Sequence, residues 1–249
     1  MEGDDRRQCD GDRDRKVHLM LIKAQPKKFF YSPANIAGGA GAVGGGPATL
    51  AYKSSASAGS GGPTISYGTI AFTSGTYAVL AILYVPNNPG PTTVSSVSVG
   101  GNALVQATGA YAANSPAGIA VDVWVSTGTI SGASQAVSVT YGAGTWGTSA
   151  VALYSLTTTT PTPAHGANNL TANSTSITQS IVVPTSGVAL AASASQGGHV
   201  LTFTNATSDV TFVTGSYNFG HLTSTGTVSV TGTPSASDGL VIGLASWGP

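Results

Sequence analysis

The residues that could carry acid–base or metal chemistry are few after position 53. They are three aspartates and three histidines, namely Asp122, Asp209, Asp238, His165, His199 and His221. A glycosidase would need two of the aspartates to converge in space, because none lies close to another in sequence. A metal site formed by His199, His221 and Asp209 would lack the short sequence spacing of typical ligand pairs. We therefore interpret Asp209 and Asp238 as turn and cap residues and the histidines as loop and surface residues, and we predict no catalytic, cofactor or metal site.

Two tryptophans offer a different chemistry, the stacking of an indole ring on the apolar face of a sugar. Trp124 lies in the run GIAVDVWVST, and Trp146 lies in the turn-like run YGAGTWGTS. Either indole could contact a glycan, since a flat aromatic ring presents a large apolar surface. The alternative is that Trp124 seals one face of a sheet and Trp146 packs on a neighbouring subunit.

Lysine and arginine are confined to the N-terminal fifth of the chain, and the rest carries only three aspartates. No lysine or arginine occurs from Ser54 to Pro249, whereas an average protein devotes about a quarter of its residues to charge. Clustered basic residues that could neutralise phosphates are absent there, so we expect no nucleic-acid partner. No run approaches the roughly 18 apolar residues of a membrane span, so we expect no membrane insertion. This composition favours a passive, packed structural role over catalysis.

Composition divides the chain into three parts. Residues 1–28 form a charged head that we expect to be flexible, and residues 1–19 read as an upstream extension, because Met20 opens the start-like run Met-Leu-Ile-Lys. Residues 29–63 are rich in Gly, Ser and Ala and read as an extended arm. Phe29, Phe30 and Tyr31 would anchor this arm on a partner. Residues 64–249 then form the β domain.

Short β-type runs bounded by Gly, Pro, Asn and Ser fill this third part. Thr76–Val85 is apolar on both faces, as in a strand buried on both sides. In Gly118–Thr127 the alternation places Ile119, Val121, Val123 and Val125 on one face and Asp122 and Trp124 on the other. His165 follows Pro163 in the stretch TTTTPTPAHGANN, which reads as a linker. Further strands are predicted at Val94–Val99, Gln135–Tyr141, Ser149–Leu156, Ile177–Val183, Gly187–Ser195, His199–Thr204, Val210–Thr214, Tyr217–Thr223, Thr227–Thr231 and Gly239–Trp247.

Two segments of the β domain echo each other. VSVTYGAGTWGTSAVALYSL (137–156) aligns with VSVTGTPSASDGLVIGLASW (228–247), at an offset of 91 residues, the difference between 228 and 137. A weaker echo links TSGTYAVLAI near Ser74 with TSGVALAASA near Ser186. The echoes indicate that the two halves of the domain occupy equivalent sheet positions.

The order of these motifs is similar to that of a known family. The hairpin pattern V-x-V-G-G-x-x-L at Val97–Leu104 precedes a strand with Trp124, a VSVT strand at 137–140 and a closing apolar strand. This order resembles the jelly-roll β-sandwich domains of tailed-phage virion proteins, which occur in tail fibres, spikes and head decorations. The resemblance implies an all-β, jelly-roll-like antiparallel sandwich behind the Gly-rich N-terminal arm.

The functional expectation is a non-enzymatic structural protein of a phage-like particle. Its partners would be other copies of itself and other virion proteins, with a host-surface glycan as a further candidate, and its location would be the virion. The alternative is a carbohydrate-binding adhesion module or an extracellular filament subunit on a bacterial surface.

Overall fold

A computed structural model describes residues 46–59, 62–86, 93–114, 118–142, 146–212 and 217–249. Every helix or strand assigned in this part of the chain is a β-strand, and the strands pair antiparallel throughout. The predicted all-β antiparallel fold is therefore confirmed. The head and the proposed arm anchor, Phe29, Phe30 and Tyr31, lie outside the described residues.

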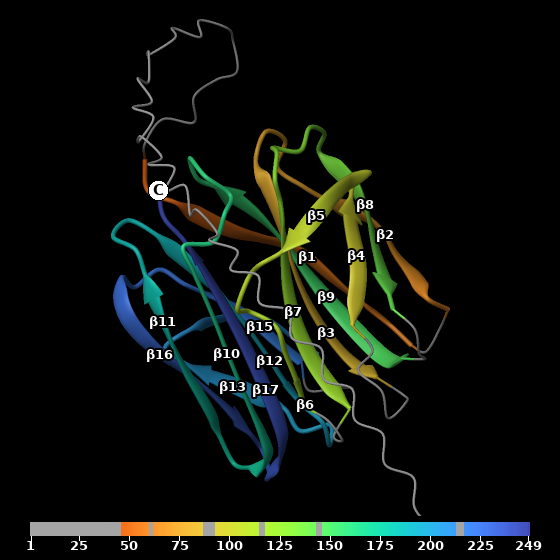
Figure 1. Ribbon diagram of the computed structural model, residues 1–249, viewed down its shortest axis with the longest axis vertical. Coiled ribbons are helices and arrows are strands. Elements are labelled where there is room, and N and C mark those ends of the chain that lie inside the picture. Colours follow the sequence, from red (N-terminus) through yellow and green to blue (C-terminus); the bar gives the residue numbers. More distant parts are fainter. Residues whose placement is uncertain (1–45, 60–61, 87–92, 115–117, 143–145, 213–216) are drawn as a thin grey trace, which may run out of the picture. The chain divides into compact units, whose positions relative to one another are not determined.

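The first half of the described chain forms one sheet in the order β1-β9-β3-β7-β5-β4-β8-β2, with β6 paired to β7 (Figure 1). Its end strands β1 and β2 lie next to each other, so the sheet is nearly closed and barrel-like. Apolar side chains from its two walls meet in a core of their own. The strands are β1 (Thr49–Ala58), β2 (Thr64–Ala71), β3 (Tyr77–Pro86), β4 (Val94–Val99), β5 (Asn102–Gln106), β6 (Ala112–Asn114), β7 (Ile119–Ser126), β8 (Ser134–Tyr141) and β9 (Trp146–Thr157).

The second half forms two sheets that face each other across a second core. One sheet has the order β10-β17-β12-β15-β14 and the other the order β11-β16-β13. The strands are β10 (His165–Ser174), β11 (Ile177–Val183), β12 (Val188–Ser195), β13 (Leu201–Thr204), β14 (Thr207–Phe212), β15 (Tyr217–Leu222), β16 (Gly226–Pro234) and β17 (Asp238–Trp247).

A tight turn closes the first sheet between β4 and β5. Gly100 and Gly101 both adopt positive φ angles, 59° and 78°, which is the backbone of a two-residue type I′ hairpin turn. Ser98 pairs with Ala103 on either side of it. A Cβ atom on Gly100 would also overlap the side chain of Gln135, so only glycine fits there. The predicted hairpin at Val97–Leu104 is confirmed.

The two halves pack back to back through a third and larger core. Strands β3, β7 and β9 of the first half lie against β12 and β17 of the second, so these strands are buried on both faces. This arrangement explains why their sequences are continuously apolar. Strand β7 alternates as predicted: its valines and Ile119 face the other half, whereas Trp124 faces the core of the first half.

The strand orders of the two halves match position by position. The inner order β1-β9-β3-β7 corresponds to β10-β17-β12-β15, and the outer order β2-β8-β4 corresponds to β11-β16-β13. The echo between 137–156 and 228–247 falls on β8–β9 and β16–β17, which occupy equivalent places. Aligned residues even share a face, since Tyr154 and Ala245 both line the core between the halves. The predicted equivalence of the two halves is thus confirmed.

Two segments differ from the sequence-based expectation. Residues 49–58, within the range predicted as an arm, form β1 and pair with β9 along its length. His165 begins the edge strand β10 instead of lying in a linker, because residues 165–171 pair with β17. Both are edge strands with few large apolar side chains, so local composition carries little signal for them.

Candidate functional site

Trp124 is part of the core of the first half. Its side chain is only 8% exposed and packs among the apolar residues between the two walls of the nearly closed sheet. Its indole face is therefore covered in this arrangement, which favours the core interpretation over a sugar platform. Trp146 is the first residue of β9, opposite Pro86, but its side chain lies outside the described structure, so its proposed glycan or subunit contact stays a prediction.

Asp122 is a fully buried carboxylate beside Trp124. The Gln106 amide donates to both carboxylate oxygens at 2.9 Å, and the backbone N–H of Val123 donates to Oδ1 at 2.9 Å. Burial raises the pKa of the Asp122 carboxyl to about 6, although these donors oppose the rise. The Trp124 indole N–H also lowers the pKa of this carboxyl by favouring its ionised form. Its distance and angle do not meet the criteria for a hydrogen bond. The enclosure of this carboxylate identifies it as a core group.

Of the acid–base candidates, the structure brings Asp209 and His221 together, and both lie on the paired strands β14 and β15 instead of in the predicted loops. His221 Nδ1 lies 2.8 Å from Asp209 Oδ1, and Tyr154 of the first half donates its hydroxyl to Asp209 Oδ2 at 3.0 Å. Burial, and then the neighbouring Asp209 charge, raise the pKa of the Tyr154 phenol, so that it stays a donor. This network therefore ties the two halves together across their shared core.

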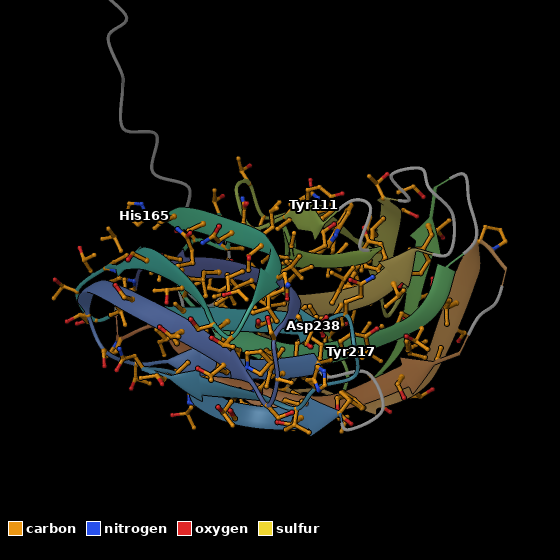
Figure 2. The ribbon with its side chains drawn as sticks, turned by 90° about the horizontal axis from the view of Figure 1, so that it is seen from below. Tyr111, His165, Tyr217 and Asp238 are labelled. Atoms are coloured by element: carbon orange, nitrogen blue, oxygen red, sulfur yellow. The ribbon has the colours of Figure 1, made fainter. Side chains whose placement is uncertain are left out.

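The remaining candidates are scattered. Asp238 accepts hydrogen bonds from Ser195 and from the backbone of Gly197, which is the predicted turn-capping role. His199 Nδ1 lies 3.5 Å from Ser235 Oγ, and His165 lies at the opposite end of the β10–β17 strand pair from Asp238 (Figure 2). Within the described ranges, no three His, Cys, Asp or Glu side chains gather as they would around a metal ion.

A hollow with both apolar and polar walls lies at the junction of the two halves, and the sequence did not indicate it. This junction cavity has a volume of about 250 Å³. Strands β1 and β9 provide one wall, and β14 and β15 provide the other, so residues far apart in sequence converge there. Its lining comprises Ser57, Ala58, Gly59, Thr148, Ser149, Phe212 and Tyr217.

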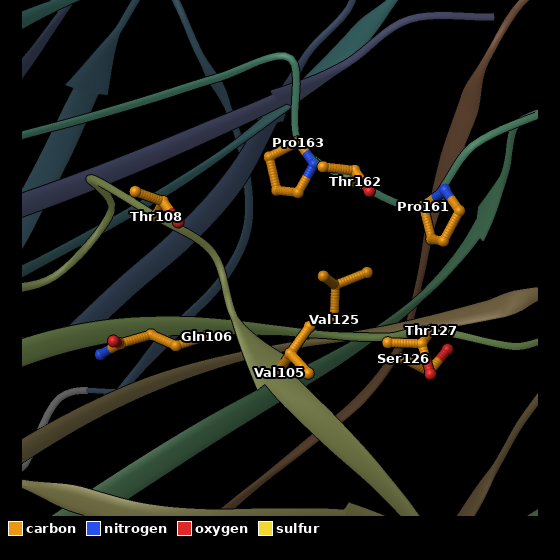
Figure 3. Close-up of a pocket in the computed structure, with 9 residues that line it drawn as sticks. All are labelled: Val105, Gln106, Thr108, Val125, Ser126, Thr127, Pro161, Thr162 and Pro163. Atoms are coloured by element: carbon orange, nitrogen blue, oxygen red, sulfur yellow. The ribbon is translucent and has the colours of Figure 1, made fainter. Parts of the chain in front are cut away.

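Two further hollows flank the junction. One, of about 210 Å³, lies between the β5–β7 region and the segment that joins the halves, where Pro161 and Pro163 face Val105 and Val125 (Figure 3). The other, of about 240 Å³, is lined almost wholly by polar groups, including His221. Neither contains a group positioned to attack or to exchange protons with a substrate beyond that histidine.

Comparison with known proteins adds no relative. No family model matches the sequence, and searches of curated proteins and of solved structures found no match either. In the described part of the chain, no helix has the length and apolarity needed to cross a membrane.

Proposed function

We propose that this chain is a non-enzymatic structural protein of a phage-like particle, serving as a capsid decoration, spike or tail-fibre component. It would assemble in the virion with other copies of itself and with other virion proteins. The contacts would be its two uncharged outer faces, supplemented by the arm with Phe29, Phe30 and Tyr31.

The observation that carries this proposal is the character of these outer faces. One is formed by β2, β8 and β4 and the other by β11, β16 and β13, and none of these six strands contains a charged residue. Small hydroxyl side chains pair across their strands: Thr64 with Thr140 (3.0 Å), Ser98 with Ser138 (3.4 Å), Thr178 with Thr231 (2.8 Å) and Ser180 with Ser229 (2.7 Å). Such faces can be covered with little cost from charge desolvation.

The fold supports the same proposal. Each half distributes eight equivalent strands over two layers, and consecutive strands such as β8 and β9 cross from the outer to the inner layer. We assign each half as a jelly roll, an architecture that builds viral capsid domains. Two equivalent outer faces on one chain would let each copy contact two neighbours.

Charge placed on one outer face tests the assembly. Ser138→Lys on the first face and Ser229→Lys on the second should each weaken association of the full chain at least tenfold, because each places an unpaired charge in an uncharged interface and its desolvation is costly. Ser131→Lys, at an exposed loop position, is the matched control and should assemble like the unchanged chain. Sedimentation velocity and electron microscopy would follow the assemblies.

The proposal would be overturned if the unmodified full chain stayed monomeric at high concentration, and if the chain shortened by residues 1–45 did so too. Assembly that both lysine variants leave intact would show that the outer faces are not the contacts.

A further inference from the structure

The junction cavity combines polar and apolar walls, and none of its described lining residues is charged. Its polar side is formed by two hydroxyls that bond each other: Tyr217 Oη lies 3.0 Å from Thr148 Oγ1. The Tyr217 phenol is protonated at neutral pH, and burial raises its pKa further, so it remains a hydrogen-bond donor. A ligand would therefore meet an organised group of neutral donors and acceptors.

The apolar side of the cavity is an aromatic ring held in place by its neighbours. Phe212 is half-buried and packs edge-to-face on Phe219, with ring centroids 6.3 Å apart at an interplanar angle of 85°. Thr148 is exposed, so the cavity opens to solvent on the hydroxyl side.

The lining limits the class of ligand. None of the described lining residues carries a charge, so an ion would lose its hydration without gaining an oppositely charged partner among them. The hydroxyls of Thr148 and Tyr217 already bond each other, and only a ligand with its own polar groups could use their remaining donor and acceptor capacity. The volume of about 250 Å³ has room for a small ring, and the cavity is open enough for the rest of a longer ligand to extend into solvent. A pyranose has the required form, with one apolar face and hydroxyls around its rim.

We propose that the junction cavity binds a single neutral pyranose unit of a glycan, with the ring of Phe212 against its apolar face. Thr148 and Tyr217 would bond its hydroxyls. This binding site does not depend on the assembly proposed above, because its lining belongs to one chain and to neither outer face.

Binding of neutral monosaccharides to the full chain would test the site. Saturation-transfer NMR should detect a bound hexose, and intermolecular NOEs should connect its protons with the rings of Phe212 and Tyr217. Thr148→Val, which keeps the shape but removes the hydroxyl, should weaken binding about tenfold. Phe212→Leu should weaken it by a similar factor, because it removes the aromatic face.

Matched controls separate the site from general effects on the fold. Thr227→Val and Phe203→Leu make the same chemical changes away from the cavity and should leave binding unchanged. If a cavity variant fails to fold, the NOEs of the unchanged chain still test where the sugar binds. The proposal is wrong if no neutral hexose binds at millimolar concentration, or if a bound sugar shows NOEs only to aromatic rings outside the cavity. Equal binding by Thr148→Val, Phe212→Leu and the unchanged chain would also overturn it.

Discussion

The carboxyl group of Asp122 couples the stability of the first half to pH. Its pKa is about 6 in the folded chain, against 3.8 for an ordinary aspartate. Below pH 3.8 both the folded and the unfolded states hold the proton, so the carboxyl does not make the folding stability depend on pH. Between pH 3.8 and pH 6 only the unfolded state is ionised, so folding stability falls as the pH rises through this window, and it levels off once the folded carboxyl also ionises above pH 6.

Asp122→Asn should remove this dependence. The two pKa values differ by about 2 units, which corresponds to an upper bound of about 3 kcal/mol between pH 4 and pH 8. We expect the variant to be more stable than the unchanged chain at pH 8 and to show a flatter pH profile in urea unfolding. A variant whose stability falls between pH 4 and pH 8 as steeply as that of the parent would contradict this assignment.

The Tyr154 hydroxyl gives a second prediction for a single residue. Tyr154→Phe removes the bond to Asp209 that links the halves, while the bond between Asp209 and His221 survives. Hydrogen bonds to charged groups contribute about 1.5–3 kcal/mol, so chemical denaturation should show a loss in this range. Asp209→Asn in the Tyr154→Phe background should then cost less than in the parent, because the two groups share one interaction.

Side chains, not backbone pairing, close the second sandwich at its edges. In the first half, β5 pairs with both β4 and β7 and so joins the two walls. In the second half, the Asn218 amide bridges the gap by donating to Leu201 O at 2.9 Å and to Ser208 Oγ at 3.1 Å. At the opposite edge, Asn169 and Ser246 donate to carbonyls of β11. These donors satisfy edge carbonyls that would otherwise invite another strand.

Asn218→Ala should therefore destabilise the second half. The substitution leaves the buried carbonyl of Leu201 without its donor, and such losses cost about 1–3 kcal/mol. Asn169→Ala, which removes a comparable bond at an exposed position, is the matched comparison and should cost about 0.5 kcal/mol or less. Equal and small effects of the two substitutions in urea unfolding would show that the Asn218 bridge is not needed.

Periodicity predicted most strands but not those whose stability comes from their partners. The apolar runs of β3, β9, β12 and β17 and the alternation of β7 were readable because burial dictates their residue types. Strand β10 (HGANNLTANS) is polar and depends on its pairing with β17, so its sequence carries no such signal. The junction cavity was unreadable for a related reason: Ser57, Thr148 and Phe212 come from separate strands, and only the packing of the halves joins them.

At the scale of the whole molecule, the repeated strand order explains the continuous apolar composition of the inner strands. Each half alone would expose one apolar face of its inner sheet, and the other half covers that face. The echo at an offset of 91 residues indicated equivalent positions. It could not indicate back-to-back packing, because an apolar strand does not specify what covers it. The segment between the halves is held by the bond from the Trp247 indole to Pro161 O at 2.8 Å.

The shared core predicts that the halves unfold together. Leu190 of β12 is fully buried between them, so Leu190→Ala should cost about 2–5 kcal/mol. Native-state hydrogen exchange should show this loss equally in the slowest amides of β3 and β9 and in those of β12 and β17, although the substitution lies in one half only. Leu170→Ala, at a side chain that is 48% exposed, makes the same change outside the core and should leave exchange unaltered. The prediction would be wrong if amide protection fell in β12 and β17 while β3 and β9 kept theirs. The first half would then be stable without the second, and the two halves would be independently folded units that dock on each other.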